Sequence, residues 1–379
     1  MSVSRRQFLK SSAVTASVPL VTGLSIDSSE ARIGDAVDLT LGYRPGAIRM
    51  NLNENPLGPP AAAVAAAQSA IPATNRYVSP ALLKSLFAEF HQMDKDWVIA
   101  GNGSTEILKN VSLAFARDSS NNVVSARETW NVTPKYAGIL GAKLNYINLI
   151  RNKHYEFDID AMLKAVDRNT SIFFVVNPNN PTGAILSYEE LKRIADSLPK
   201  EVLFVIDEAY AQYTPDAKSG IDLLKAGYEN VLVARTFSKA WGLAALRCGY
   251  AIGHPDVLKK IAMHGCDAAS LNIAGYSALQ AVLGDQTHLQ QSRKLARDIS
   301  AFYKKEAKKL SLNVVTGSVP LPFILLELGK RTKEIQQQLE KRNIFVRYVA
   351  SWGLPQHVRI SGGLEADNRA FFRELKTLL

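Results

Sequence analysis

The stretch from Val202 to Tyr210 reads V-L-F-V-I-D-E-A-Y. Its five apolar residues end in two acids, which is typical of a strand that is buried on both faces and opens into a polar site. Three more runs have the same continuous apolar character: Asn122 to Ala126, Ser171 to Val176 and Val231 to Ala234. Because helix-like segments alternate with these runs from about Asn51 onward, the sequence predicts an α/β domain with a mostly parallel sheet between helices.

Capping signals mark the beginnings of several expected helices. Ser79 and Pro80 suit the cap and first turn of a helix that continues to Met93, and Ser187 to Glu190 form a capping box. After about Gly265 the pattern changes to helices mixed with short strands. The expected elements there are helices from Thr287 to Leu310 and from Thr332 to Arg342, and strands from Phe323 to Leu328 and from Phe345 to Val349. These elements predict a second, smaller α+β domain.

Size and composition agree with a folded protein of two domains. The chain has 379 residues, which exceeds the roughly 250–300 residues at which one hydrophobic core stops growing. The net charge of +10 is spread along the chain, so we expect no nucleic-acid partner. The four lysines between Lys304 and Lys309 have the spacing of a solvated helix face. Cys248 and Cys266 are too few for a disulfide framework; buried thiols are the first interpretation, and a single bridge is the second.

The N-terminus differs from the rest of the chain. Residues 4–10 read S-R-R-Q-F-L-K, which resembles a bacterial twin-arginine export signal, and Ser29-Glu30-Ala31 offers a small-x-small cleavage site. The run from Ala13 to Leu24 is too short and too polar to span a bilayer. We therefore expect engagement of the twin-arginine export machinery, a periplasmic location and no stable membrane span. A disordered basic N-terminus and a cytoplasmic location form the alternative.

Three motifs follow the apolar runs directly. Lys239 ends the string T-F-S-K, Asp207 follows a wholly apolar strand, and Asn177 to Gly183 read N-P-N-N-P-T-G. Taken singly, each has an ordinary structural explanation, namely a surface lysine, a salt-bridged acid and a tight turn. Loops at the carboxyl ends of parallel strands are also where α/β folds bind ligands. Together and in this order, the three motifs carry more weight than any one of them alone.

In this order, the strings N-P-N-N-P-T-G, D-E-A-Y and T-F-S-K, with an arginine eight residues after the lysine, resemble the fold-type I pyridoxal-phosphate (PLP) dependent aminotransferases. The histidinol-phosphate aminotransferase branch is the nearest in pattern. Further matching strings are L-N-E-N-P-L-G-P-P from Leu52, N-R-Y-V-S-P from Asn75, G-N-G-S-T-E-I-L from Gly101 and V-R-I-S from Val358. The resemblance runs from about Gly42 to the C-terminus and implies the fold-type I architecture.

The resemblance implies a role for each residue around the cofactor ring. Lys239 matches the lysine that holds PLP as a Schiff base and then moves protons as general base and acid. Asp207 matches the acid that keeps the pyridine nitrogen protonated, which makes the ring an electron sink. Asn180 and Tyr210 match the pair that hydrogen-bonds the ring hydroxyl. Trp130 lies where the family has an aromatic residue stacked on the ring.

Other matches concern the phosphate, the partner subunit and the substrate. The residues expected to form the phosphate cup are Ser104, Thr105, Thr236, Ser238 and Arg247. Tyr77 matches a tyrosine that reaches the cofactor phosphate of the other subunit, which implies a homodimer with shared active sites. Arg359 matches the arginine that clamps a substrate carboxylate. The residues expected at the variable part of the substrate are Arg347, Tyr43 and Asn53. No metal site is expected.

The resemblance implies an amino donor, an amino acid or a histidinol-phosphate-like amino phosphate, and a 2-oxo acid acceptor such as 2-oxoglutarate. The expected domains are an export signal (1–31), an N-terminal arm joining the small domain (32–59), a large PLP-binding domain (60–264) and a small C-terminal domain (265–379). Two alternatives are a PLP-dependent decarboxylase of the threonine-phosphate type and a non-catalytic binding protein on the same scaffold. Export conflicts with cytoplasmic histidine biosynthesis, so another amino substrate is at least as plausible.

Overall fold

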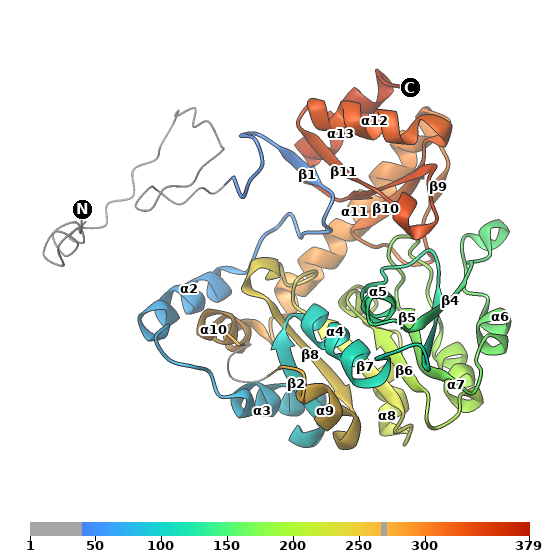
Figure 1. Cartoon of the computed structure of the whole chain (residues 1–379). Coiled ribbons are helices and arrows are strands. Elements are labelled where there is room, and N and C mark those ends of the chain that lie inside the picture. Colours follow the sequence, from blue (N-terminus) through green and yellow to red (C-terminus); the bar gives the residue numbers. More distant parts are fainter. Residues whose placement is uncertain (1–39, 267–270) are drawn as a thin grey trace, which may run out of the picture. The chain divides into compact units, whose positions relative to one another are not determined.

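The computed structural model describes residues 40–266 and 271–379 (Figure 1). The chain divides into two compact units between Ala47 and Ile48, and the fold presented here belongs to the second unit, Ile48–Leu379. The expected export signal and residues 32–39 of the expected N-terminal arm lie outside the described residues. Within the described part of the chain, none of the helices is long and apolar enough to cross a membrane.

A seven-stranded sheet forms the larger part of the second unit. Its strand order is β2-β8-β7-β6-β5-β3-β4, with bounds β2 Val98–Asn102, β3 Asn122–Ala126, β4 Lys143–Ile147, β5 Thr170–Val176, β6 Leu203–Asp207, β7 Val231–Thr236 and β8 Cys248–Gly253. Strands β4, β3, β5, β6 and β7 pair in parallel, and β8 runs antiparallel to both β7 and β2. All four apolar runs of the sequence are strands of this sheet, and the predicted mostly parallel sheet is confirmed.

Side chains alternate between two cores on the two faces of this sheet. In β6, Phe204 and Ile206 belong to one core, while Leu203 and Val205 belong to the other. Strands buried on both faces read as continuous apolar runs for this reason. The helices that contribute to the core with Leu203 are α4 Ser104–Phe115, α5 Val132–Ile139 and α9 Pro255–Ala262. The helices that contribute to the core with Phe204 include α3 Pro80–His91, α6 Ile159–Lys164, α7 Tyr188–Ser197, α8 Gly220–Lys225 and α10 Ile273–Val282.

A second sheet of five strands has the order β1-β11-β12-β10-β9. Its strands are β1 Ile48–Met50, β9 Val314–Val315, β10 Phe323–Glu327, β11 Ile344–Tyr348 and β12 His357–Ser361. The helices around it are α11 Gln286–Lys309, α12 Thr332–Lys341 and α13 Glu365–Lys376. Strand β1 pairs in parallel with β11, so residues before the large sheet are tied to the C-terminal part of the chain. The remaining helix, α2 Ala61–Ala70, packs against α10. The predicted domain boundary at Gly265 stays a prediction.

The capping predictions have mixed outcomes. The capping box at Ser187 is confirmed, because Ser187 Oγ accepts from the Glu190 amide and the Glu190 carboxylate accepts from the Ser187 amide. The side-chain cap predicted at Ser79 is wrong. The Ser79 side chain makes no capping hydrogen bond, and the Leu82 amide donates instead to the Ser79 carbonyl oxygen at 3.1 Å. Both cysteines are free, buried thiols, which confirms the first interpretation.

Candidate functional site

A cavity of about 360 Å³ opens where β5, β6 and β7 end. Each of these parallel strands contributes its last residue to the wall, namely Val176, Asp207 and Thr236. The first turn of α4 and residues of β11 and β12 also contribute to the lining. The carboxyl ends of parallel strands are the usual ligand-binding edge of an α/β sheet, and the volume lies in the range of small-molecule sites.

Asp207 and Lys239 contribute opposite charges to this cavity. Burial is the main cause that raises the pKa of Asp207 to about 7, although the Ala209 amide donates to its carboxylate at 3.1 Å and Lys239 attracts it. Burial, followed by the charge of Arg359, lowers the pKa of Lys239 to about 8. The Lys239 ammonium donates to the Leu52 carbonyl oxygen at 3.0 Å. Roughly a tenth of this amine is therefore unprotonated at pH 7.

Three further side chains occupy the wall beside these charges. Tyr210 is almost fully buried, and burial raises the pKa of its hydroxyl to about 12, so the hydroxyl stays protonated and can donate. The Asn180 side chain accepts a 2.9 Å hydrogen bond from Arg359. The Trp130 amide donates to the Asn180 carbonyl oxygen at 2.7 Å, and both residues line the cavity.

An anion cup lies at the start of α4. Ser104 and Thr105 are the first residues of this twelve-residue helix and line the cavity. A Cβ atom on Gly103, whose φ is +78°, would lie 2.4 Å from Arg247 Nη2, and one on Gly249 would lie 2.2 Å from the Ser104 nitrogen. Only glycine therefore lets the arginine and β8 approach the helix start so closely. Unpaired amides at a helix start together with a guanidinium favour a phosphate.

Two hydroxyls complete this cup. The Thr236 hydroxyl donates to Ser238 Oγ at 2.9 Å, and the Ser238 amide donates to Thr236 Oγ1 at 3.2 Å. Arg247 Nη1 reaches Ser238 Oγ at 3.5 Å and donates to the Ala244 carbonyl oxygen at 2.8 Å. The cup therefore brings together hydroxyl, guanidinium and backbone donors from the ends of two strands and one helix.

Two arginines face each other on neighbouring strands of the five-stranded sheet. Arg347 of β11 and Arg359 of β12 are directly opposite in the register. Their guanidinium carbons lie 5.7 and 5.9 Å from the centre of the Trp352 ring. Arg359 is buried, and burial lowers its pKa to about 10. Within the described residues, neither arginine has a carboxylate within ion-pair distance, so both are available to an anionic ligand.

The cavity brings together twelve of the fifteen predicted site residues. The twelve are Ser104, Thr105, Trp130, Asn180, Asp207, Tyr210, Thr236, Ser238, Lys239, Arg247, Arg347 and Arg359. Asn53 lies behind Tyr210 and does not line the cavity; its side chain donates to the Tyr210 hydroxyl at 2.7 Å and accepts from Ser361 at 2.7 Å. Tyr77 is 82% exposed. Tyr43 belongs to the first compact unit, and its contact with substrate stays a prediction.

The prediction from sequence missed seven lining residues, which are Asn51, Leu52, Glu54, Val176, Ala209, Ala244 and Trp352. Trp352 is the most consequential, since it contacts both arginines and lies edge-on to Trp130 with ring centres 6.1 Å apart. Its only sequence signal was its place seven residues before Arg359. Glu54 lies inside the string L-N-E-N-P-L-G-P-P that carried part of the resemblance.

With this geometry established, comparisons with known proteins identify the family. Residues 45–374 match the family model for aminotransferase class I and II. The chain belongs to this family. The match covers most of the chain, so the cavity, both sheets and all twelve lining residues predicted from sequence fall within it.

Individual relatives agree with this assignment. Histidinol-phosphate aminotransferase 2 of Pseudomonas fluorescens is 36% identical over 339 residues, which covers 88% of this chain and 89% of the relative. A solved structure from Erwinia carotovora atroseptica, provisionally named a histidinol-phosphate aminotransferase, matches with a TM-score of 0.81 and 27% identity, covering 88% of this chain and 96% of that one. The histidinol-phosphate aminotransferase of Sinorhizobium meliloti, solved with pyridoxal-5'-phosphate, has the same fold, with a TM-score of 0.79 at 24% identity, covering 88% and 92%.

These comparisons confirm the predicted family and fold. They also confirm the predicted class of enzyme, a PLP-dependent aminotransferase. The residue roles, the subunit arrangement, the substrate and the location in the cell remain proposals.

Proposed function

We propose that the cavity holds PLP on Lys239 and that the enzyme moves an amino group from an amino acid or amino phosphate to a 2-oxo acid. The amino donor becomes an oxo compound, and the 2-oxo acid becomes an amino acid. One observation carries the proposal: a buried carboxylate, a partly unprotonated lysine and a phosphate cup line the same cavity. PLP is the cofactor whose ring nitrogen, aldehyde and phosphate match these three groups.

The residues present fit this cofactor. Asp207 is buried and has no cation within ion-pair distance among the described residues, and a protonated ring nitrogen would supply one. The backbone and hydroxyl donors around Ser104 and Arg247 suit a phosphate dianion. When bound, the cofactor supplies an electron sink that stabilises negative charge on the substrate carbon.

The chain's own side chains would orient the reactants and move protons. Lys239 would first hold the cofactor; its amine, once free, is placed to take a proton from the substrate carbon and return it. The Tyr210 hydroxyl and the Asn180 amide are placed to hydrogen-bond the ring hydroxyl. Trp130 offers an aromatic face at the same wall. These roles rest on the shared cavity and on the pKa values of Asp207 and Lys239.

The proposed substrates carry a carboxylate or a phosphate. Arg359 is buried and retains an unpaired Nε, so an incoming carboxylate would meet a desolvated guanidinium. Arg347, opposite it, is exposed and suits a second anionic group at the mouth of the cavity. Relatives named histidinol-phosphate aminotransferase support an amino phosphate, whereas the export signal supports another amino acid. We propose that the physiological amino donor is another amino acid rather than a histidinol-phosphate-like amino phosphate.

The proposed homodimer is supported by a segment of the chain that is rich in exposed apolar side chains. Among the described residues, six of the twelve large apolar side chains that are exposed lie between Leu57 and Phe90. Tyr77, at 82% exposure, lies within this segment. A partner subunit seated on this segment would cover these apolar side chains. The proposal includes a contact between Tyr77 and the partner's phosphate cup.

Subunit mixing tests the shared site. Tyr77→Ala and Lys239→Ala should each be nearly inactive. In a mixed dimer, the chain carrying Tyr77→Ala keeps Lys239 and receives an intact tyrosine from its partner. With random exchange, about a quarter of the wild-type sites should recover. Absence of recovery, with exchange verified by labelled subunits, would contradict the shared site.

We also propose export through the twin-arginine route, with removal of residues 1–31. The support is the string S-R-R-Q-F-L-K at residues 4–10. Fractionation of cells should find the wild type in the periplasm and the variant Arg5→Lys/Arg6→Lys in the cytoplasm. A matched variant, Lys10→Arg, should be exported normally. Export of the twin-lysine variant at the wild-type level would refute this route.

Two experiments test the enzymatic proposal. Borohydride treatment should fix a phosphopyridoxyl group on Lys239, and the visible absorption of the protein should vanish in Lys239→Ala but persist in the control Lys259→Ala. A panel of amino donors with 2-oxoglutarate should yield glutamate and the matching oxo compound. Release of carbon dioxide without an oxo acid would favour the decarboxylase, and absence of any visible band would favour a non-catalytic protein.

A further inference from the structure

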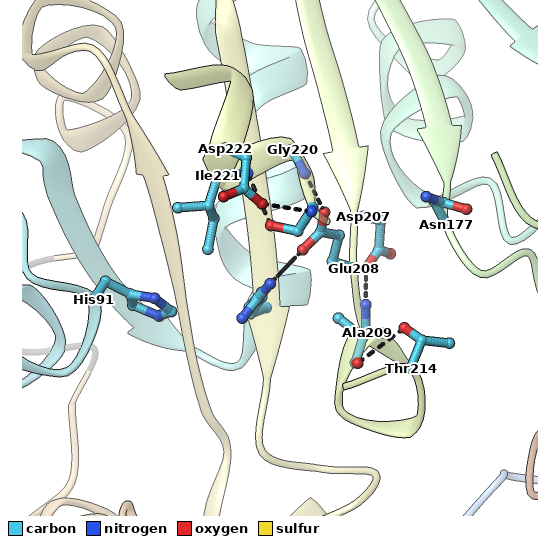
Figure 2. A network of polar contacts seen from close by, with 12 residues as sticks. His91, Asn177, Asp207, Glu208, Ala209, Thr214, Gly220, Ile221 and Asp222 are labelled. Carbon is cyan, nitrogen blue, oxygen red and sulfur yellow. Dashed lines mark hydrogen bonds and ion pairs between the residues drawn. The ribbon is translucent and has the colours of Figure 1, made fainter. Parts of the chain in front are cut away.

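Adjacent acids at the end of β6 lie on opposite faces of the large sheet. Asp207 lines the cavity of about 360 Å³ that we propose for PLP, which we call the cofactor cavity. Glu208 lines a second cavity of about 300 Å³. Figure 2 shows the Glu208 carboxylate turned toward Gly220, while Asp207 is turned toward Ala209. Strand β7 repeats this arrangement, because Thr236 faces the cofactor cavity and Arg235 faces the second one. Alternation along a strand accounts for both pairs.

The two residues that face away from the cofactor cavity bind each other. Arg235 Nε and Nη2 donate to Glu208 Oε2 at 3.0 and 2.7 Å. The other oxygen, Oε1, accepts from the Gly220 amide at 2.7 Å. The side chains are 15% and 2% exposed. A cross-strand pair so well bonded and so little solvated fixes the relative position of the two strand ends.

We propose that Glu208 and Arg235 are positioning residues of the active site. Their ion pair fixes the ends of β6 and β7 that carry Asp207 and Lys239, and it cancels the charge of Glu208 next to Asp207. The inference rests on the proposed function, since it assumes that Asp207 and Lys239 serve the cofactor.

The electrostatic part of this role follows from the neighbours of Asp207. Burial has the largest effect on the pKa of Asp207, followed by the Ala209 amide and the charge of Lys239. The charge of Glu208 also acts on this pKa, and it raises the value. Arg235 is the cation that offsets this effect. Besides Asp207, the charged groups that act on the pKa of Lys239 in the cofactor cavity are Arg359, Glu54 and Arg247.

The second cavity also contains the cations Lys218 and Arg293, but among the described residues Arg235 is the cation within ion-pair distance of Glu208. His91 shares a 2.7 Å hydrogen bond with the Tyr250 hydroxyl. Burial lowers the pKa of His91 to about 3, and the charges of Arg235 and Lys225 act in the same direction. His91 is therefore neutral at physiological pH. Burial also raises the pKa of Tyr250, so the tyrosine is neutral as well. Loss of either member of the pair leaves the other charge without its ion-pair partner behind the cofactor cavity.

The test compares Arg235→Gln, Glu208→Gln and the double variant as holoenzymes. The readout is the midpoint of the pH titration of the visible absorption of the bound cofactor. Arg235→Gln leaves a negative charge and should raise this midpoint by about 0.5 unit, because cations in the cavity hold their protons more tightly. Glu208→Gln leaves a positive charge and should lower it by about 0.5 unit. The double variant should return to within about 0.2 unit of the wild type.

A purely structural role cannot produce shifts of opposite sign that cancel. Shifts in the same direction, no shifts, or a double variant that equals the worse single variant would overturn the inference. Arg331→Gln, which breaks the exposed pair Arg331–Glu334, is the matched control and should not move the midpoint. Circular dichroism establishes that each variant is folded.

Two further variants keep the inference testable. If Arg235→Gln does not fold, Arg235→Lys retains the charge but loses the planar fork. It should keep the wild-type midpoint and lower the unfolding temperature, and a shifted midpoint in this variant would count against the inference. Glu208→Gln alone still predicts a downward shift, since its amide oxygen can accept from Gly220. Absence of a visible band in the wild type would instead refute the proposed function.

Discussion

Asp207→Asn should stabilise the cofactor-free protein at alkaline pH. The same substitution should abolish turnover of the enzyme with its cofactor bound. Burial raises the pKa of Asp207 from 3.8 to about 7. Between these two values the folded protein holds a proton that the unfolded chain has released, so stability falls as the pH rises and stays low above pH 7. An asparagine has the same shape and no charge, and it therefore escapes this penalty.

The expected magnitude follows from the same displacement. A pKa raised from 3.8 to about 7 corresponds to at most about 4 kcal/mol at pH 8. About 2–3 kcal/mol of this penalty develops between pH 5 and pH 8. The advantage of Asp207→Asn over the wild type should therefore grow by that amount across this range. Added cofactor should reduce the advantage, because it pairs with the carboxylate and binds only the folded wild type well.

Urea unfolding of the cofactor-free wild type and variant at pH 5 and pH 8 measures this effect. Asp298→Asn, on the exposed face of α11 with a side chain 57% exposed, is the control and should change stability by less than about 0.5 kcal/mol at either pH. An advantage of equal size at both pH values would refute the electrostatic reasoning. Near-wild-type turnover of Asp207→Asn would remove Asp207 from the mechanism.

Three further predictions concern the other walls of the cavity. Arg359→Gln should lower kcat/KM for carboxylate substrates by about 10²-fold, the loss of a charged hydrogen-bonded pair, while the visible cofactor band persists; unchanged steady-state kinetics would contradict it. Gly103→Ala places a Cβ 2.4 Å from Arg247 Nη2 at φ +78°, so equilibrium dialysis should show cofactor binding weakened by about 10-fold or more, and wild-type affinity would refute the close-packed cup. The rate at which Lys239 in the cofactor-free protein reacts with PLP should rise with pH and level off above about pH 8; a stopped-flow profile that is flat from pH 6 to 9 would show that its pKa is not the controlling one.

The fold was predictable from sequence where one physical cause dominates. Strands β3, β5, β6 and β7 are buried on both faces, so their continuous apolar runs had one interpretation in an α/β context. The capping box at Ser187 was predictable because all its partners lie within four residues. Ser79 shows the limit of such reasoning: the residue type suits a cap, but the backbone carbonyl takes the hydrogen bond instead.

The site was predictable only as far as contiguous motifs carry it. Asp207 and Lys239 stand at the ends of recognisable strands, so their convergence followed from parallel pairing. The role of Asn53 was not accessible in this way. Its partners, Tyr210 and Ser361, are 157 and 308 residues away in the chain. Trp352 was missed for the same reason, because its significance comes from ring contacts with Trp130 and two arginines rather than from a motif.

The charges of the cavity also indicate the polarity of its ligands. The pKa of Asp207 is raised, whereas the pKa values of Lys239 and Arg359 are lowered. Burial is the main cause of all three shifts. Each group is therefore destabilised in its charged form until an opposite charge arrives. The arrangement of these groups favours a cation beside Asp207, an anion such as a phosphate at Ser104 and a carboxylate at Arg359. A cofactor with a basic ring nitrogen and a phosphate, together with an acidic substrate, meets all three requirements at once. Binding would thus recover stability that the folded chain alone gives up, which is why residues that weaken the cofactor-free protein are the ones expected to perform the chemistry.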